Sequence, residues 1–536
     1  MKALTAAEMR EVDRLTMERG KVSGLQLMEA AGKHVAGAVL RFRTTPAPLR
    51  IVVLCGKGNN GGDGLVSARH LKTAGLDPHV WFFGEEPKND TDAAQNFKQW
   101  QHAGGNITFI SDAAAWEKKV PALRRAQIVV DALLGTGLRG APEGVIARAI
   151  EDLNRISKNA TAATPALILA VDTPSGLPSD GEPPRGPVVV AHRTVTFTAP
   201  KIAQLESSHA AHCGALEVVQ IGSPRELVEE IAKGESRWAE PNEFANLPLV
   251  RAWDSNKGIY GNALLIAGSL GKSGAAILCG SAALRGGAGL VTIATPSPII
   301  SIVAAAHPEY MTEPLEATET GNAASRNLHI PRFAEILKKK TVLGMGPGLG
   351  TEPETQEFIR NVVRESEIPL ILDADALNAF AGNASALRDR KAKFLAITPH
   401  PGEMARLCGK STREVQAERL EIARNSARDW NAFVVLKGFH TVVAAPDGEF
   451  FVNTSGNPGL AKGGSGDVLT GFLTALTAQF GTGDWLRILT LGVYLHGKAA
   501  ELATAATDIS GLLSGELVDA LPHARAKLLE ELRQLA

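Results

Sequence analysis

The 536-residue chain is too long for a single hydrophobic core, so we expect at least two domains. A formal net charge of −1 excludes the basic field on which nucleic-acid binding depends, and we expect no nucleic-acid partner. No apolar run is long enough to span a membrane, and the first thirty residues carry interleaved charges instead of a signal-peptide core. With 44% hydrophobic residues, the composition predicts a cytoplasmic protein of the α/β fold class that binds no membrane.

The cysteines at 55, 213, 279 and 408 lie far apart in apolar stretches and show no C-x-x-C spacing. This pattern is typical of buried, reduced thiols and not of a disulfide framework or a zinc site.

Short β-rich runs alternate with helical patterns over residues 1–222. The runs are 50–55, 78–83, 127–135, 166–176, 194–199 and 216–222. Near-continuous apolar strands separated by helices predict a largely parallel sheet that is covered on both faces. Helical spacing over 5–20 predicts an N-terminal helix packed on this sheet.

A charged stretch without strand patterns, 223–245, is predicted to be a linker between two domains, 1–222 and 246–536. A second series of strand patterns follows it, at 262–269, 289–296, 341–348, 369–377, 394–403, 432–438 and 441–448. The segment 459–536 is predicted to be mostly helical. Since the two halves show no repeat of each other, the pattern indicates a fusion.

Three glycine-rich loops follow strands of the first half: "GKGNNGGDG" (56–64), "DALLGTGLRGAPEG" (131–144) and "DTPSG" (172–176). Ligands of open parallel sheets bind at the carboxyl ends of the strands, so these loops could line one crevice. Residues 56–61 match the dinucleotide fingerprint G-x-G-x-x-G, which is weak alone. Gly58, Gly61 and Gly62 would let backbone amides approach a phosphate at a helix N-terminus.

Polar side chains of the same loops suggest two kinds of chemistry. Asn60, Asp131 and Ser175 offer oxygen donors, which suit a hard cation with flexible coordination better than zinc. Asp172, at the end of an apolar strand, is a candidate for proton transfer. The alternative for Asp172 is a turn or helix-capping residue.

The loops "GKGNNGGDGLVSARHL", "VVDALLGTGLRG" and "AVDTPSGL", in this order, resemble the NAD(P)H-hydrate epimerase family over residues 1–222. The resemblance implies a Rossmann-like domain that inverts C6 of hydrated NADH or NADPH by loss and return of the hydroxyl, with Asp172 catalytic. It implies a potassium ion held by Asn60, Asp131 and Ser175. The implied substrate-binding residues are Asn59, Asn60, Gly61, Gly62, Asp63, Gly135, Thr136, Gly137, Leu138, Arg139, Gly140, Ala141 and Asp172.

The stretch "GNPGLAKGGSGDVLTGFLTAL" (456–476) carries the chemistry of the second half. Glycines 463, 464 and 466 precede a helix, so successive amides and the helix dipole could hold an anion. Asp467 beside that site could take a proton from a hydroxyl that attacks a phosphoryl group. The alternative is a glycine-rich turn with a capping aspartate.

"GGSGD" resembles the ribokinase-like superfamily, and four further motifs resemble the ADP/ATP-dependent NAD(P)H-hydrate dehydratase family over 245–536: "GMGPGLG", "LDADALN", "TPHPGEMARL" and "VLKGFHTVV". The resemblance implies a ribokinase-like domain in which Asp467 is catalytic. The implied hydrate-binding residues are Ala276, Gly346, Gly348, His400 and Asp467, and the implied nucleotide-binding residues are Lys437, Gly438, Phe439, His440, Thr441 and Gly466. Asp373 and Asp375 could help to hold Mg²⁺ but are as often structural, so neither is assigned a role.

Together the resemblances imply a bifunctional repair enzyme that takes hydrated NADH or NADPH, with ADP as phosphoryl donor, AMP and phosphate as products, and Mg²⁺ in the dehydratase half. By analogy with ribokinase-like dehydratases we expect a homo-oligomer. Two other functions stay open at this point: a small-alcohol kinase fused to a dinucleotide-binding domain, and a nucleotide-sensing module without catalysis.

Overall fold

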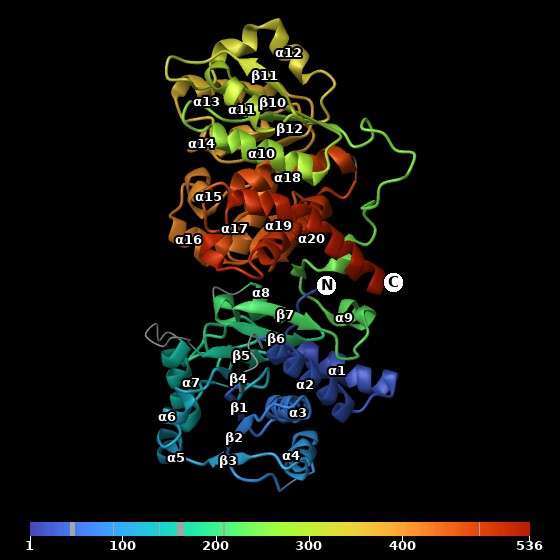
Figure 1. Ribbon diagram of the computed structural model, residues 1–536, viewed down its shortest axis with the longest axis vertical. Helices are drawn as coiled ribbons and strands as arrows, with labels where there is room; N and C mark the ends of the chain where they lie inside the picture. Colours follow the sequence, from blue (N-terminus) through green and yellow to red (C-terminus); the bar gives the residue numbers. More distant parts are fainter. Residues whose placement is uncertain are drawn as a thin grey trace. The chain divides into compact units, whose positions relative to one another are not determined.

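The computed structural model describes residues 1–535 except 43–48, 89, 139, 158–165, 207–208 and 482 (Figure 1). The chain divides into two compact units, Met1–Trp238 and Ala239–Ala536. Among the described residues, no helix has the length and apolar character needed to cross a membrane.

Seven strands of the described part of the first unit form one parallel sheet in the order β3-β2-β1-β4-β5-β6-β7. They are β1 (Ile51–Cys55), β2 (His79–Phe83), β3 (Ile107–Ile110), β4 (Ile128–Ala132), β5 (Leu167–Val171), β6 (Arg193–Phe197) and β7 (Ala215–Val219). The strand order reverses between β1 and β4, and ligands of doubly wound sheets bind at such a switch point. The parallel Rossmann-like sheet predicted from the sequence is therefore confirmed.

Helices cover both faces of this sheet, α2–α4 on one and α5–α7 on the other (Figure 1). The first unit contains α1 (Ala6–Gly20), α2 (Gly24–Leu40), α3 (Asn59–Thr73), α4 (Asp92–His102), α5 (Ala113–Glu117), α6 (Val120–Leu123), α7 (Gly144–Ser157), α8 (Ile202–Leu205), η1 (Ala210–Cys213) and α9 (Arg225–Ile231). The predicted N-terminal helix is α1, which starts at a capping box between Thr5 and Glu8.

Part of the segment predicted as a linker folds onto the first unit. Helix α9 packs against α1, where Leu227 and Val228 join a buried cluster with Met9 and Val12. The two-residue strand β8 (Arg237–Trp238) then ends this unit. The first unit thus keeps some of the charged stretch after Gly222, because that stretch contains apolar residues at helical spacing.

Strands β9–β17 form the sheet of the second unit, in the order β11-β10-β9-β12-β13-β14-β15-β16-β17. They are β9 (Asn262–Ile266), β10 (Leu290–Pro296), β11 (Met311–Leu315), β12 (Val342–Met345), β13 (Leu370–Leu372), β14 (Leu395–Ile397), β15 (Phe433–Leu436), β16 (Thr441–Ala444) and β17 (Phe450–Asn453). Pairing is parallel from β11 to β15 and antiparallel from β15 to β17.

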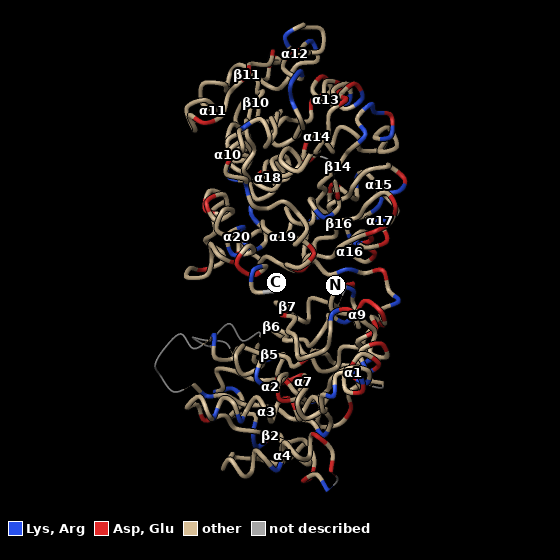
Figure 2. Tube along the Cα trace, turned by 90° about the vertical axis from the view of Figure 1, so that its right-hand side faces the viewer, with Lys and Arg blue, Asp and Glu red and all other residues tan. Residues whose placement is uncertain are grey.

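Helices α10 and α18–α20 lie on one face of the second sheet and α13–α17 on the other (Figures 1 and 2). The α-helices are α10 (Ser273–Gly286), α11 (Ile300–Ala306), α12 (Pro331–Leu337), α13 (Pro353–Glu365), α14 (Asp375–Asn378), α15 (Pro401–Cys408), α16 (Thr412–Ala417), α17 (Arg419–Trp430), α18 (Ser465–Phe480), α19 (Trp485–Ala503) and α20 (Ser514–Leu535). Short 3₁₀ turns are η2 (Pro241–Phe244), η3 (Ser297–Ile299), η4 (Ser325–His329), η5 (Ala384–Arg388), η6 (Pro458–Leu460) and η7 (Ile509–Gly511). The predicted helical character of 459–536 is confirmed.

Charge and cysteine placement follow the composition. Lys and Arg residues are interspersed with Asp and Glu in both units (Figure 2). All four cysteines are free thiols, as predicted, and Cys55, Cys213 and Cys279 are buried. Cys408 is partly exposed, against the prediction, because it ends α15 at the surface.

Candidate active sites

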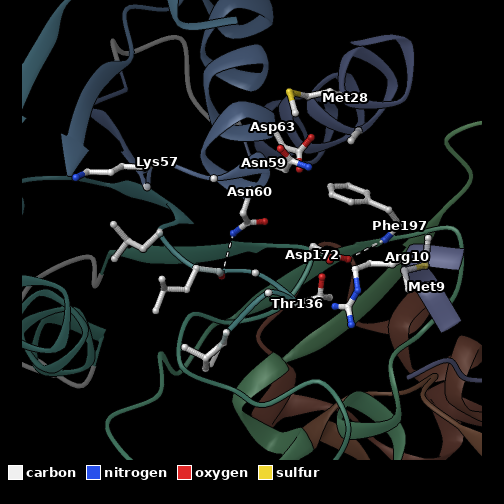
Figure 3. Close-up of a pocket in the computed structure, with 18 of the residues that line it drawn as sticks. Met9, Arg10, Met28, Lys57, Asn59, Asn60, Asp63, Thr136, Asp172 and Phe197 are labelled. Carbon is white, nitrogen blue, oxygen red and sulfur yellow. Dashed lines mark hydrogen bonds between the residues drawn. The ribbon is translucent and has the colours of Figure 1, made fainter. Parts of the chain in front are cut away.

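A cavity of about 900 Å³ opens at the carboxyl ends of the strands in the first unit (Figure 3). All three predicted loops contribute to its wall. The predicted residues that line it are Asn59, Asn60, Asp63, Gly135, Thr136, Gly137, Leu138, Ala141 and Asp172. Gly61, Gly62 and Gly140 do not line it, and Arg139 lies outside the described residues. Its volume suits a nucleotide-sized ligand.

The glycines of the first loop serve mainly to bring helix α3 close to the sheet. Helix α3 already begins at Asn59, so Gly61 and Gly62 lie within it. A Cβ on Gly61 would stand 1.9 Å from the Gly56 carbonyl oxygen, and one on Gly62 would stand 2.6 Å from Met28 Sδ. Gly58, the N-cap residue, has open space around it. Of the three glycines predicted to admit a phosphate, only Gly58 leaves room beside the helix N-terminus.

Asn60, Asp131 and Ser175 meet around the backbone of Leu134. Ser175 Oγ donates to Asp131 Oδ1 at 2.6 Å and accepts from the Leu134 N–H at 2.9 Å. Asn60 Nδ2 donates to the Leu134 carbonyl at 3.0 Å. Asp131 is fully buried, and burial raises its pKa to about 6. No described lysine or arginine pairs with it; its oxygens accept only from the Ser175 hydroxyl and from the Leu133 and Ser175 N–H groups among the described residues, so its negative charge has no cationic partner there.

Asp172 lies at the end of β5 in a left-handed backbone conformation, with φ of 60°. Its Oδ1 accepts hydrogen bonds from Lys201 Nζ at 2.5 Å, from Thr196 Oγ1 at 2.9 Å and from the Phe197 N–H at 3.4 Å. Lys201 is completely buried and also donates to Thr196 Oγ1 and the Phe197 carbonyl. Such a strained residue held by a buried cation is typical of a functional site.

Four further carboxyl groups line the same cavity; Asp92 and Glu143 lie toward solvent, whereas Asp63 and Asp13 interact with Asp172. Asp63 comes from α3 and Asp13 from α1, and Figure 3 shows Asp63 beside Asn59, apart from Asp172 in this view. Burial raises the pKa of Asp63 well above its usual range, and repulsion from Asp172 and Asp13 adds to this rise. Burial also raises the pKa of Asp13 to about 6, while Lys201 opposes that shift.

The second candidate site gathers around Asp373, at the carboxyl end of β13. Lys437 Nζ donates to Asp373 Oδ1 at 2.6 Å, and Thr470 Oγ1 donates to Asp373 Oδ2 at 2.7 Å. Since Lys437 follows β15 and Thr470 lies in α18, Asp373 ties the predicted nucleotide loop to the predicted catalytic helix. Asp375 is engaged as well, because its Oδ2 accepts from the Gly350 N–H at 2.8 Å.

Helix α18 presents Asp467 in its first turn, as predicted. Gly464 caps the helix with φ of 94°, and a Cβ on Gly466 would stand 3.4 Å from Lys437 Nζ. Burial raises the pKa of Asp467 to about 6, reinforced by Asp373 and opposed by Lys437. No described residue forms a hydrogen bond or ion pair with its carboxyl group. Asp467 therefore lies beside the partly buried Lys437 ammonium and a helix N-terminus with its own oxygens available.

His400 is the N-cap residue of α15. Its Nδ1 accepts from the N–H groups of Gly402 at 3.0 Å and Glu403 at 3.3 Å, which places the ring proton on Nε2. Burial lowers the His400 pKa, and Lys437 and Arg406 lower it further. The imidazole is thus neutral and can donate from Nε2, which lies 3.3 Å from Glu403 Oε1. Glu403 in turn lies 3.9 Å from Lys437 Nζ, so His400 belongs to the same cluster.

The predicted nucleotide loop, 437–441, is shaped by a half-buried arginine, Arg419. Arg419 donates to the carbonyl groups of Leu436 at 3.0 Å and Lys437 at 3.1 Å. Gly438 and His440 both have positive φ, and the Phe439 and His440 rings stack at 4.0 Å. Phe439 is exposed, whereas Thr441 begins β16. The loop therefore turns its carbonyls inward and presents an aromatic ring outward.

The remaining predicted residues lie at the ends of β9 and β12. Gly346 has φ of 131° and approaches the backbone so closely that a Cβ would stand 1.8 Å from the Asp373 carbonyl oxygen. Gly348 packs against Ala275, and Ala276 is buried under Gly268. Gly346 joins the Asp373 cluster directly, Gly348 lies in the loop after β12 against the start of α10, and Ala276 lies in the first turn of α10.

Several residues of these sites were missed in the sequence, namely Asp13, Lys201, Glu403, Arg419 and Thr470, and Asp373 was left without a role. Lys201 carries the clearest signal, since a lysine directly follows the apolar run "TVTFTAP". The others lie within ordinary amphipathic helices, where a charged or polar residue is expected on the solvent face.

Comparison with known proteins covers both units. A family model described as NAD(P)H-hydrate dehydratase matches residues 263–523, and one described as YjeF-related protein N-terminus matches residues 24–203. The bifunctional NAD(P)H-hydrate repair enzyme of Moorella thermoacetica is 38% identical over 546 residues, covering 100% of this chain and 98% of the relative. That of Escherichia coli is 34% identical over 513 residues, covering 95% and 92%. The ADP/ATP-dependent NAD(P)H-hydrate dehydratase of Bacillus subtilis, crystallised with ATP and Mg²⁺, is 32% identical with a TM-score of 0.46, covering 55% of this chain and 100% of that structure.

Proposed function

The chain belongs to the family of bifunctional NAD(P)H-hydrate repair enzymes, and we propose that each unit carries one of the two activities. The first unit interconverts the R and S forms of hydrated NADH or NADPH. The second dehydrates the S form and converts ADP to AMP and phosphate. The observation that carries this division is the presence of two separate carboxylate–lysine clusters, Asp172–Lys201 and Asp467–Asp373–Lys437, each at the carboxyl ends of its own sheet.

In the epimerase unit, the hydrate lies in the 900 Å³ cavity with C6 near Asp172. The C6 hydroxyl leaves with a proton as water, and the lone pair of the ring nitrogen forms a double bond to C6. Water then adds to the other face, and Asp172 accepts a proton from it. The hydrogen bonds from Lys201, Thr196 and Phe197 fix the Asp172 carboxyl group for this role.

In the dehydratase unit, Asp467 takes the proton of the C6 hydroxyl as its oxygen attacks the β-phosphorus of ADP, and AMP leaves. Phosphate then departs from C6 with its electron pair as the ring nitrogen donates its own, and loss of a proton from C5 completes the ring of NADH or NADPH. The amides at the start of α18 and the charge of Lys437 support the transferring phosphoryl group. The 437–441 loop and Gly466 hold the nucleotide. Ala276, Gly346, Gly348 and neutral His400 hold the hydrate.

We propose that Asn60, Asp131 and Ser175 hold a potassium ion. The residues fit this ion, because a fully buried carboxyl group has no cationic partner among the described residues and lies beside the Ser175 hydroxyl, while Ser175 and Asn60 both contact Leu134. A bound cation would orient the 134–137 loop and compensate the Asp131 charge. Epimerisation should therefore fall when potassium is replaced by N-methylglucamine. Asp131→Ala should weaken ion binding and epimerisation while leaving dehydration of the pure S form unchanged; an equal loss of both would indicate misfolding.

Mg²⁺ is proposed to enter with the phosphates of ADP, where it would neutralise charge. Both Asp373 oxygens are engaged by Lys437 and Thr470, which makes Asp373 a poor ligand, whereas the Asp467 carboxyl group is available. Chelation of Mg²⁺ should abolish dehydration and spare epimerisation. The expected homo-oligomer stays a prediction for light scattering to check.

One mixture tests the proposed function. The full chain, hydrated NADH, ADP and Mg²⁺ should regenerate the absorbance of reduced nicotinamide and release inorganic phosphate. An R-enriched hydrate should be consumed completely, because epimerisation feeds the S form. A small-alcohol kinase would accumulate a phosphorylated product, and a nucleotide sensor would produce neither signal.

A further inference from the structure

The epimerase reaction proposed above needs two proton-transfer groups, and Asp172 suits only one of them. The departing hydroxyl must receive a proton, and the returning water must lose one. Asp172 Oδ1 already accepts three hydrogen bonds, including one from the buried Lys201 ammonium. These contacts hold Asp172 in one orientation, and a carboxyl group on one side of the ring cannot serve both the hydroxyl that leaves from one face and the water that returns to the other.

Asp13 has the opposite surroundings. It extends from α1 into the wall of the same cavity, and its Oδ1 is sealed from solvent without a hydrogen-bond partner among the described residues. An unpaired, buried carboxylate oxygen is costly, so burial favours the protonated form. The charged groups facing it are Lys201 from the start of α8, Asp172 from the end of β5 and Asp63 from α3.

Of the two cavity carboxyl groups that interact with Asp172, Asp13 is the better proton donor. A general acid works best when its pKa lies near the working pH. Burial brings the pKa of Asp13 to about 6, whereas that of Asp63 is raised well above its usual range, so Asp63 gives up its proton less readily at neutral pH.

We propose that Asp13 is a second catalytic residue of the epimerase unit, the general acid that protonates the C6 hydroxyl. As the C6–O bond breaks, the Asp13 proton joins the departing oxygen to form water, and the nitrogen lone pair forms the double bond to C6. Water then bonds to C6 from the other face, the double-bond electrons return to nitrogen, and the surplus proton passes to Asp172. Water in the cavity returns this proton to Asp13. Nothing is oxidised or reduced, and only the configuration at C6 changes.

The test uses the full chain with purified R and S hydrates of NADH, without ADP. Asp13→Asn keeps the size and polarity of the side chain but carries no acid, so kcat for epimerisation should fall on the order of 10²–10³-fold with KM nearly unchanged. Because a general acid acts in its protonated form, epimerisation by the parent protein should decline as pH rises through about 6. Asp13→Asn should lose this decline, and Asp13→Glu should recover it with part of the activity.

The matched control is Glu11→Gln, which removes an exposed carboxyl group from the same helix and should change nothing. Thermal unfolding of each variant reports on the fold of the first unit. Retention of parental kcat and pH profile by Asp13→Asn would overturn the proposal. So would a loss shared by Asp13→Glu together with lower thermal stability, since that result assigns Asp13 a purely structural role. Absence of epimerisation in the parent protein would instead contradict the proposed function of the whole unit.

Discussion

Each unit places a lysine against an aspartate at the carboxyl end of its sheet, fully buried in the first unit and partly buried in the second, and the two pairs differ in which aspartate they engage. In the first unit Lys201 contacts Asp172, the residue proposed to accept the proton. In the second unit Lys437 contacts Asp373, while the proposed base, Asp467, has no partner among the described residues. The lysine therefore holds the proposed catalytic carboxyl group, Asp172, directly in the first unit. In the second unit it holds Asp373, a neighbour of the proposed base.

The difference follows from what each lysine faces. Lys201 Nζ donates to Asp172, Thr196 and Phe197. Since Asp172 is the only carboxylate among these three acceptors, the lysine charge acts on that group. Lys437 lies close to Gly466 at the start of α18, where a phosphoryl group is expected. If Lys437 paired with Asp467, the phosphate would have to compete with Asp467 for the lysine. The incoming hydroxyl would have to compete with the lysine for the Asp467 carboxylate. Pairing with Asp373 avoids that competition.

The largest effect is expected at Asp467. Asp467→Asn keeps the shape of the side chain but cannot accept a proton, so dehydration should fall on the order of 10²–10⁴-fold. ADP affinity should stay nearly normal, because the α18 amides and Lys437 are unchanged. Epimerisation by the same molecules is the internal control and should be intact. S-hydrate turnover within a few-fold of the parent would remove Asp467, and the comparison with Asp172, from the mechanism.

A smaller effect is expected when the supporting pair is broken. Asp373→Asn still accepts from Thr470 but leaves Lys437 with only Glu403, at 3.9 Å. Uncoupling a fully buried ion pair costs about 3–5 kcal/mol, and this pair should cost less because Lys437 is partly exposed. The second unit should still unfold at lower temperature, and dehydration should fall with it. Glu365→Gln, which removes an exposed pair with Lys391, should leave both unchanged. If Asp373→Asn is as stable and active as the parent, the pair does not position the site.

The sequence predicted the residues of the strand-end loops more completely than the residues that helices bring to the two sites. Asn60, Asp131 and Ser175, which the structure brings together around Leu134, could be grouped because each follows an apolar strand in a glycine-rich loop, and the ends of parallel strands meet at one edge. The residues that helices supply to the two sites were not predicted. In the sequence, Asp13 and Thr470 are ordinary members of amphipathic helices. Their role depends on which helix face packs at the strand ends, and that is set by tertiary packing.

The fold shows a similar limit. Central strands such as β1 and β9 were predicted because they are buried on both faces and nearly continuous in apolar residues. The edge strands β3 and β11 were missed. Phe109 of β3 and Met311 of β11 are both largely exposed, and β11 contains Pro314, which is tolerated only at an edge. Half-exposed strands lack the pattern on which the prediction relied.

The pH dependence of the two activities offers a finer comparison. Asp467 acts as a base and must be ionised, and burial raises its pKa to about 6. Dehydration should therefore drop about tenfold for each pH unit below that value, since the ionised fraction falls in this proportion. Epimerisation, limited by the protonated form of Asp13, should decline on the opposite, alkaline side. The rates of dehydration and epimerisation by the same chain should be measured between pH 5 and pH 8 with purified S and R hydrates. The dehydration rate should rise with pH and the epimerisation rate should fall. Rates that change in the same direction would contradict the assignment of one acid and one base.

The smallest effect is expected when the units are separated after Trp238. If the clusters act independently, residues 1–238 should epimerise hydrates within a few-fold of the full chain and without nucleotide. A cut after Gly222, where the charged stretch begins, should do worse, because it removes Leu227 and Val228 from their packing against α1. Burial of each such side chain contributes about 1.5–3 kcal/mol, and α1 carries Asp13, so this shorter chain should melt earlier and lose activity. Equal activity of the two truncated chains would show that α9 does not support α1, whereas inactivity of both would mean that the epimerase site needs residues beyond 238.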